Sequence, residues 1–191
     1  NPAVIHLLER FPEYHRALVY NNAALPLIEK FIDSPGLDWH LLSMRPDAIH
    51  IIEKNLDRVN WKGLSTNPAA IHLIEQNMDK IDWQCLSRNP AAIHILEKNL
   101  DRVDWRYLCR NPAAIRILEQ NLDKVYWEEL SLNPETVHLI EQNMDKARDK
   151  IDWSYISRKP CAINLLEKNQ DKIDWLSFGW NPAIFYPKLE L

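Results

Sequence analysis

The stretch NPAAIHLIEQNMDKIDWQCLSR, residues 67–88, is followed at once by NPAAIHILEKNLDRVDWRYLCR, residues 89–110, and then by NPAAIRILEQNLDKVYWEELSL, residues 111–132. All three share asparagine-proline, glutamate, asparagine and tryptophan in the same places, so the chain repeats itself every 22 residues. A period of this length is typical of repeat proteins, in which each repeat buries its apolar face only against its neighbours. The repeat therefore decides the fold class.

The 22-residue spacing extends over most of the chain, through Pro46, Pro68, Pro90, Pro112 and Pro134 and through Trp39, Trp61, Trp83, Trp105 and Trp127. Four residues, Ala147–Lys150, are then added, and because four residues are about one helical turn we expect them to lengthen a helix. We predict one repeat domain over residues 1–191. It contains degenerate repeats at 1–20 and 21–44, regular repeats at 45–66, 67–88, 89–110, 111–132, 133–158 and 159–180, and a half repeat at 181–191.

Each repeat carries the signals of two helices. Asn67 is a favourable N-cap and Pro68 a favourable first helical residue, so a helix should begin there and run to about Lys80 with one apolar face. Asp82 resembles the N-cap of a second, short helix that contains Trp83. Because one such pair cannot bury its own apolar face, the expected fold is all-α, an α-solenoid of helix-turn-short-helix repeats.

Two residue types recur at places that favour a structural ladder. A tryptophan buries about 150–250 Å², so stacked tryptophans should hold the repeats together. The asparagine near the end of each first helix falls inside the apolar arc, where a buried amide must be hydrogen-bonded. We expect it to satisfy free carbonyls and the turn of the adjacent repeat, in preference to binding a ligand. The predicted ladder comprises Trp39, Trp61, Trp83, Trp105, Trp127, Trp153 and Trp175 with Asn55, Asn77, Asn99, Asn121, Asn143 and Asn169.

A histidine recurs four residues after the proline, with a glutamate three residues later: His6, His50, His72, His94 and His138 with Glu9, Glu53, Glu75, Glu97 and Glu141. Residues three apart share a helix face and could form a metal or acid-base pair. Stacked helices lie about 8–10 Å apart, however, and Zn–N bonds are about 2 Å long, so neighbouring repeats cannot readily share a metal. We interpret this face as solvated and ion-paired, and we expect no catalytic residue, metal or cofactor.

The composition narrows the function classes. Of 191 residues, 46% are apolar and 26% charged, which predicts a folded core, and the net charge of −4 argues against a strongly basic nucleic-acid surface. No apolar run approaches the ~18 residues of a membrane span, so we expect no membrane contact. Cys85, Cys109 and Cys161 have no metal spacing and indicate free thiols in a reducing, intracellular compartment. Because the first residue is Asn1, we expect the sequence to be trimmed at its start.

Positions that vary between repeats are the better binding candidates, because the scaffold does not dictate them. The candidate partner-binding residues are Arg88, Arg106, Tyr107, Arg110 and Arg158. The first four are close in sequence and predict a basic, aromatic patch that would suit an acidic peptide or stacked RNA bases, although Glu128 and Glu129 interrupt it one repeat later. The plainer alternative is that they are exposed loop residues without a function.

The string NPAAIHLIEQNMDKIDWQCLSRNP resembles the short LSxNPxAIxLLExNxDKIDWxx repeats of proteins encoded by giant viruses of amoebae, of the mimivirus and marseillevirus kind. The resemblance covers essentially the whole chain, most cleanly from Arg45 to Pro182. The first two repeats depart from it, because His15 replaces the tryptophan and Phe11 and Phe31 replace the helix-end asparagine. It implies a viral protein in the infected host cytoplasm or virus factory, and it implies no particular activity.

We therefore expect a non-enzymatic repeat scaffold that binds a host or viral protein through an extended solenoid surface. One alternative is nucleic-acid binding through the Arg/Tyr patch. Another is a structural protein that self-associates through the C-terminal residues Phe185, Tyr186 and Leu191. A unique site would have to lie where the repeat is irregular, among Tyr14, His15, Asp33 and His40, and we do not favour one there.

Overall fold

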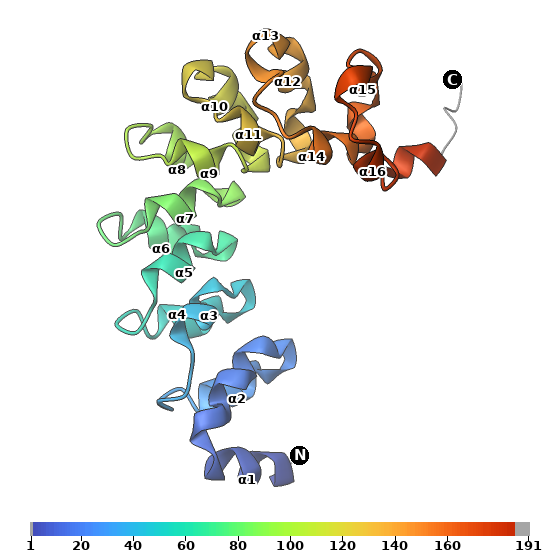
Figure 1. Cartoon of the computed structure of the whole chain (residues 1–191). Helices are drawn as coiled ribbons and strands as arrows, with labels where there is room; N and C mark the ends of the chain where they lie inside the picture. Colours follow the sequence, from blue (N-terminus) through green and yellow to red (C-terminus); the bar gives the residue numbers. More distant parts are fainter. Residues whose placement is uncertain (1, 186–191) are drawn as a thin grey trace, which may run out of the picture. The chain divides into compact units, whose positions relative to one another are not determined.

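The computed structural model describes residues 2–185, with side chains from Ile5 to Ile184, and every regular element within that range is a helix. The chain forms two compact units, Asn1–Ile95 and Leu96–Leu191. Within each unit, short helices recur with the 22-residue period of the sequence (Figure 1). The predicted all-α solenoid of helix-turn-short-helix repeats is confirmed.

Each repeat from residue 21 onward begins with a 3-10 turn that continues as a short α-helix, and because most of these pairs start at Asn-Pro we call each the Asn-Pro helix. In the first unit these are η2 (Asn22–Ala24) with α2 (Leu25–Lys30), η3 (Pro46–Ala48) with α4 (Ile49–Glu53), η4 (Pro68–Ala70) with α6 (Ile71–Glu75), and η5 (Pro90–Ala92), which continues into α8 (Ile93–Glu97). In the second unit they are η6 (Pro112–Ala114) with α10 (Ile115–Glu119), η8 (Pro134–Thr136) with α12 (Val137–Gln142), and η9 (Pro160–Ala162) with α15 (Ile163–Glu167).

The second helix of each repeat starts at the tryptophan, and we call it the Trp helix. These are α3 (Trp39–Met44), α5 (Trp61–Thr66), α7 (Trp83–Ser87), α9 (Trp105–Leu108), α11 (Trp127–Leu130), α14 (Trp153–Ser157) and α16 (Trp175–Phe178). The remaining helices are α1 (Pro2–Arg10), η1 (Pro12–Tyr20), η7 (Leu122–Lys124), α13 (Met144–Ala147), η10 (Gln170–Lys172) and η11 (Pro182–Phe185).

The two helix types form two rows in each unit. In the first unit α5 packs between α3 and α7, and the turn η4 packs between η3 and η5. In the second unit α14 packs against α16, and η6 against η8. Leucines of the Trp helices and isoleucines of the Asn-Pro helices, such as Leu64 and Ile74, are fully buried between the rows. The core is thus a continuous aliphatic layer to which every repeat adds the same few side chains.

The asparagine before each proline joins neighbouring repeats. Asn67 is fully buried, and its Nδ2 donates to the backbone oxygens of Ser43 and Arg45, at the junction of the two preceding repeats, both at 3.0 Å. Its Oδ1 accepts from the backbone N of Ala69 at 3.0 Å and so caps its own helix. The same three contacts recur at Asn89, Asn133 and Asn181. The predicted N-cap is therefore also the bond between repeats.

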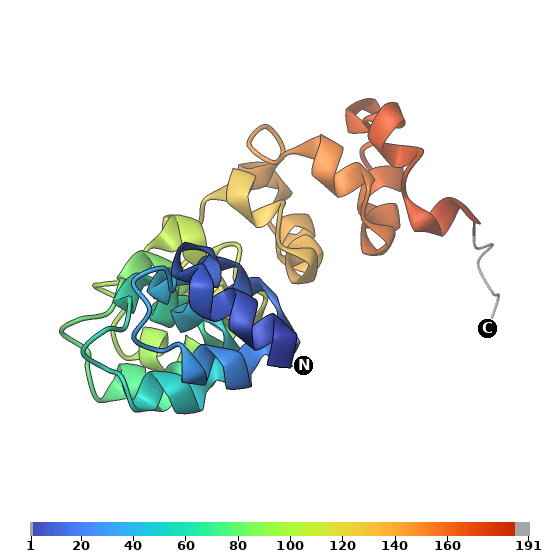
Figure 2. The same cartoon turned by 90° about the horizontal axis from the view of Figure 1, so that it is seen from below.

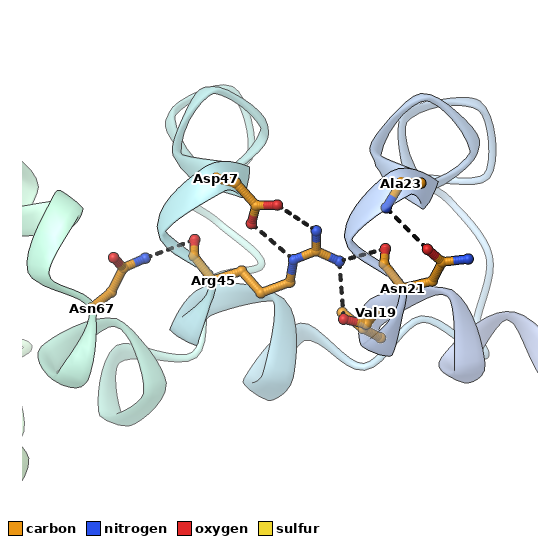
Figure 3. Close-up of polar contacts among 6 residues, drawn as sticks. All are labelled: Val19, Asn21, Ala23, Arg45, Asp47 and Asn67. Atoms are coloured by element: carbon orange, nitrogen blue, oxygen red, sulfur yellow. Dashed lines mark hydrogen bonds and ion pairs between the residues drawn. The ribbon is translucent and has the colours of Figure 1, made fainter.

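An arginine takes the place of this asparagine at the start of the first regular repeat. Nη1 of Arg45 donates to the backbone oxygens of Val19 and Asn21, at 2.9 and 3.2 Å. Its Nε and Nη2 pair with the carboxylate of Asp47 at 3.0 and 2.6 Å (Figure 3). The guanidinium thus keeps the donors to the preceding repeat and gains a counter-charge, although it does not cap the helix.

Serines form a second bond between repeats, which the sequence did not lead us to single out. The hydroxyl of Ser65 donates to the backbone oxygen of Trp61 at 2.7 Å and accepts from the backbone N of Asp82 at 2.9 Å. Asp82 in turn caps the next Trp helix, because its Oδ1 accepts from the backbone N of Cys85 at 2.8 Å, as predicted. The Trp helices α5, α7, α14 and α16 therefore start against the serine of the preceding one.

The helix-end asparagines bond a carbonyl of their own helix, as predicted, but the bonds made by the side-chain amides of Asn55, Asn77, Asn121, Asn143 and Asn169 stay within the helix and do not join it to the adjacent repeat. Nδ2 of Asn77 donates at 2.9 Å to the backbone oxygen of Leu73, one turn back in α6. The same bond recurs at Asn55, Asn121, Asn143 and Asn169, and Asn99 occupies the same place in its repeat. This local bond competes with continuation of the helix, so α6 ends at Glu75 and not near Lys80.

The tryptophans contribute less to the core than predicted. Among those in the ladder only Trp127 is buried, Trp39, Trp61, Trp83, Trp105 and Trp153 are half-buried, and Trp175 is 68% exposed. In three places a cation of the next repeat covers the indole: Arg58 over Trp39, Lys80 over Trp61 and Lys124 over Trp105, at 4.6, 5.2 and 4.8 Å from the ring centre. Tryptophan thus joins repeats through its ring face as well as through burial.

We predict that Asn67→Ala lowers the free energy of unfolding by about 3 kcal/mol, because it removes a cap and leaves two buried carbonyls without a donor. The matched variant Asn77→Ala should cost only about 1 kcal/mol, because it removes one bond within a single helix. Urea denaturation of both variants, followed by circular dichroism, measures the difference. Equal shifts of the denaturation midpoint would contradict the role assigned to Asn67.

Lys159 also takes the place of a bridging asparagine, but without the compensation that Arg45 has. Its Nζ donates to the backbone oxygen of Asn133, and its side chain does not cap the helix. Burial lowers the pKa of Lys159 to about 8. The unfolded chain, with a lysine pKa of about 10.4, therefore binds more protons between these two values, and stability should rise with pH across that window.

We predict that Lys159→Asn stabilises the protein by about 1 kcal/mol at pH 7, because it restores the cap and removes a partly desolvated charge. The gain should shrink as the pH rises from about 8 toward 10.4, because in this range Lys159 has lost its proton in the native protein but not in the unfolded chain. Thermal melts of both proteins at pH 7, 8, 9 and 10 measure the effect. A gain that does not depend on pH would show that the lysine charge is not its cause.

Candidate functional site

The repeat pattern breaks most strongly within residues 109–155 of the second unit. The four added residues do not lengthen the first helix as predicted, because Asn143 leaves the helical conformation at φ −126° and ψ 36° and ends α12. They extend the turn that follows into a separate helix, α13, whose Ala147 is fully buried. Of the four added residues only Ala147 lies in a helix, and residues 148–150 form a turn, so the prediction that the insertion lengthens a helix is wrong for three of its four residues.

The inserted residues are held by the Trp helix of their own repeat and by the following repeat. The backbone oxygen of Arg148 accepts from Nε1 of Trp153 at 2.9 Å, and its guanidinium pairs with Asp171 at 2.9 Å. Asp149 pairs with Lys172 at 3.5 Å. Lys172 occupies the place of the cations that cover the preceding tryptophan elsewhere, yet in the described residues no cation lies over Trp153. Lys172 thus pairs with the insertion and does not cover Trp153.

The start of α11 also departs from the pattern. Tyr126 stands where other repeats have the capping Asp or Asn, and its side chain provides no cap. Cys109 stands where they have the bonding serine, and its Sγ accepts from the backbone N of Tyr126 at 3.4 Å. Burial raises the pKa of Cys109 to about 11, so this thiol remains protonated near neutral pH.

Glu129 holds together two of the predicted partner-binding arginines. Its carboxylate is only 6% exposed and accepts from Nε of Arg106 through one oxygen and from the guanidinium of Arg110 through the other. Burial alone would raise the pKa of Glu129, but the two guanidinium groups outweigh it, so the pKa lies below its ordinary value. Two of the cations of the predicted basic patch are therefore largely neutralised within the repeat array.

The other members of the predicted patch differ in their exposure. Tyr107 is half-buried on α9, between the two paired arginines in sequence. Arg158 is exposed at the end of α14. Arg88 is exposed at the end of α7, in the first unit.

A pocket of about 520 Å³ opens beside Glu129 and the insertion. We call it the insertion pocket, and its lining residues are Arg110, Glu128, Glu129, Leu132, Lys150, Ile151, Asp152, Trp153 and Tyr155. Glu128, Lys150 and Asp152 are exposed at its rim, and Tyr155 is 47% exposed. The pocket therefore combines two aromatic side chains with charges of both signs.

The histidine-glutamate ladder pairs across repeats and not within one helix. His72 Nε2 lies 2.7 Å from Glu53 Oε1, and His94 Nε2 lies 2.8 Å from Glu75 Oε1. Corresponding pairs are His50 with Glu29 and His138 with Glu119, and Lys30 with Glu9 and Lys168 with Glu141 follow the same direction. All are solvated, and no three His, Cys, Asp or Glu side chains of the described residues gather as metal ligands. The ion-paired interpretation of this face is confirmed.

The irregular N-terminal residues do not form one polar cluster. His15 is buried, its Nε2 bonds the backbone oxygen of Leu8 at 2.9 Å, and its ring packs on Phe31. Tyr14 is exposed, while Asp33 pairs with Arg58 and His40 with Asn60. His15 thus replaces tryptophan as a core residue.

No protein-family model, curated protein or solved structure matches this chain. Among the described residues we find no helix with the length and apolar character that crossing a membrane requires. The three cysteines are free thiols, as the sequence predicts. The function must therefore be argued from the geometry of the insertion pocket itself.

We predict that Glu129→Gln lowers the free energy of unfolding by about 2 kcal/mol at pH 7, because two arginines lose a buried carboxylate. Glu128→Gln, its exposed neighbour, should change it by less than about 0.5 kcal/mol. Because the pKa of Glu129 is lowered, its contribution is fully present above the unfolded carboxyl pKa of about 4.3 and is lost as the pH falls through the lower native value. Denaturation at pH 7 and pH 3 measures both effects.

Proposed function

We propose that this chain is a non-enzymatic repeat scaffold that binds a protein or peptide partner at the insertion pocket. The observation that carries the proposal is the coincidence of the pocket with the one interior break in the regular repeats. Glu128, Lys150 and Tyr155 are exposed there, and within the described residues none of their side chains makes a hydrogen bond or close ion pair with another repeat. Side chains that the stacking does not require are free to recognise a partner.

The lining of the pocket favours a peptide over a small anion. Trp153 and Tyr155 supply amphipathic area of the kind that is enriched at protein interfaces. Glu128 and Asp152 oppose Lys150 at the rim, so the exposed charge is mixed. A partner segment with one apolar or aromatic anchor and flanking charges of both signs matches this surface best.

Nucleic-acid binding through the Arg/Tyr patch is less well supported. Arg106 and Arg110 already share the carboxylate of Glu129, and that pairing reduces the positive potential available to phosphates. Of the residues expected to drive self-association, Tyr186 and Leu191 lie outside the described residues, as does the side chain of Phe185. A viral origin, with a partner in the infected host cell or virus factory, is part of the proposal and rests on the resemblance of the repeats.

The test is an affinity capture from a lysate of infected amoebae, with and without nuclease, read by quantitative mass spectrometry. The double variant Lys150→Glu with Tyr155→Ala should lose a defined set of proteins that the parent chain retains after nuclease treatment. The matched control, Lys62→Glu with Tyr20→Ala, changes an exposed lysine and an exposed tyrosine of the first unit and should retain that set.

Two results would contradict the proposal. Recovery that collapses with nuclease would make nucleic acid the ligand, and the arginines would then become the residues to change. Equal recovery by the pocket variant and its control would place the binding surface elsewhere on the array.

A further inference from the structure

One junction between repeats of the second unit carries a lysine amine and a cysteine thiol on the same turn. Regular repeats have Asn-Pro-Ala at the start of the Asn-Pro helix, as at 67–69, 89–91 and 111–113, whereas residues 159–161 read Lys-Pro-Cys. The junction lies between α14 and α15, which are drawn in orange in Figure 2. The lysine and the cysteine occur at these places in no other repeat of the sequence.

Both side chains bond the preceding repeat at consecutive carbonyls. Nζ of Lys159 donates to the backbone oxygen of Asn133 at 2.5 Å. The thiol of Cys161 donates to the backbone oxygen of Pro134, with Sγ at 3.8 Å. Because the two oxygens belong to adjacent residues, the amine and the thiol lie against the same short stretch of backbone.

The Arg45 junction shows that side chains at these two places meet. Arg45 and Asp47 occupy the places of Lys159 and Cys161, and they are in contact, with Nε to Oδ1 at 3.0 Å and Nη2 to Oδ2 at 2.6 Å (Figure 3). The backbone before the 3-10 turn is the same in both junctions, with φ −82° and ψ 118° at Arg45 and φ −86° and ψ 123° at Lys159. The same backbone therefore brings the side chains of Lys159 and Cys161 within reach of each other.

The two groups differ in ways that suit a transfer from the thiol to the amine. Cys161 is exposed, so its sulfur is accessible to a molecule in solution. Lys159 is half-buried, and burial lowers the pKa of its amine to about 8, although Cys161 and Glu135 act in the opposite direction. A large neutral fraction of the amine is therefore present near pH 8, and the neutral amine is the nucleophilic form.

We propose that Lys159 and Cys161 form an acyl-transfer site, at which the acyl thioester of a small thiol modifies Lys159 by way of Cys161. The Cys161 sulfur attacks the thioester carbonyl, the bond from that carbonyl to the small thiol breaks, and the small thiol leaves with the proton that Cys161 loses. The Lys159 amine then attacks the new thioester. Its N–C bond forms, the C–Sγ bond breaks, and Sγ takes up the proton that the amine releases.

Acylation removes the unfavourable charge at this junction and keeps its hydrogen bond. The acylated nitrogen retains one N–H, which can still donate to the oxygen of Asn133, and it no longer carries the charge that burial disfavours. We therefore expect the acylated chain to melt about 3 °C higher than the unmodified chain. The site is separate from the insertion pocket and does not depend on the function proposed for it.

Incubation of the full chain with acetyl-coenzyme A at pH 8 tests the proposal. Amide-linked acetyl groups are located by peptide mass spectrometry after hydroxylamine has removed thioesters. We expect Lys159 to be acetylated about tenfold faster than the exposed Lys54, because delivery from a neighbouring thiol raises the effective concentration of the acyl group. Cys161→Ala should slow acetylation of Lys159 about tenfold. Lys159→Asn should retain a hydroxylamine-labile acetyl group on Cys161.

The matched control is Cys85→Ala, which removes a half-buried thiol of the first unit and should leave the rate at Lys159 unchanged. Circular dichroism melts check that the variants are folded, which we expect because Cys161→Ala and Lys159→Asn introduce the residues of the regular repeats. Equal rates at Lys159 in the parent chain and in Cys161→Ala would overturn the proposal, because the amine would then react directly. Acetylation of Lys159 no faster than that of Lys54 would overturn it as well.

Discussion

The buried amide of the asparagine before each proline is the interaction on which the array depends. A Trp helix ends with backbone carbonyls that have no partner in their own helix, and burial between rows would make them costly to leave unbonded. Asn67 supplies two donors to these carbonyls, while its oxygen caps the next helix. One repeat therefore cannot satisfy its backbone alone, and the short reach of the amide sets how closely the next repeat must follow.

The same constraint explains which substitutions the array accepts. Arg45 keeps the donors and neutralises its charge on Asp47, whereas Lys159 keeps one donor and carries a partly desolvated charge. Cys109 still accepts the backbone bond that a serine accepts in other repeats. These three substitutes lose the cap or the serine hydroxyl but each still makes a bond to a neighbouring repeat, so recognition has to use other positions.

Charge in this protein is used mainly to join repeats to one another. Histidines and lysines pair with glutamates of the preceding repeat, cations cover its tryptophan, and Glu129 gathers Arg106 and Arg110. One place departs from this rule. At the insertion pocket Lys150 and Glu128 remain at an exposed rim. This surface follows from interruption of the stacking and not from a separate motif.

The sequence by itself determined the features that depend on residues close together in the chain. The all-α class, the 22-residue period and the caps at Asn67 and Asp82 follow from residue types that act within a few positions of one another. Only the tertiary structure decided that Asn67 and not Asn77 joins repeats, and that His72 pairs with Glu53. It also decided that Glu129 forms ion pairs with two arginines. These contacts join residues 19 to 24 positions apart. Their geometry is set by how one repeat stacks on the next, which the periodicity of a single helix cannot supply.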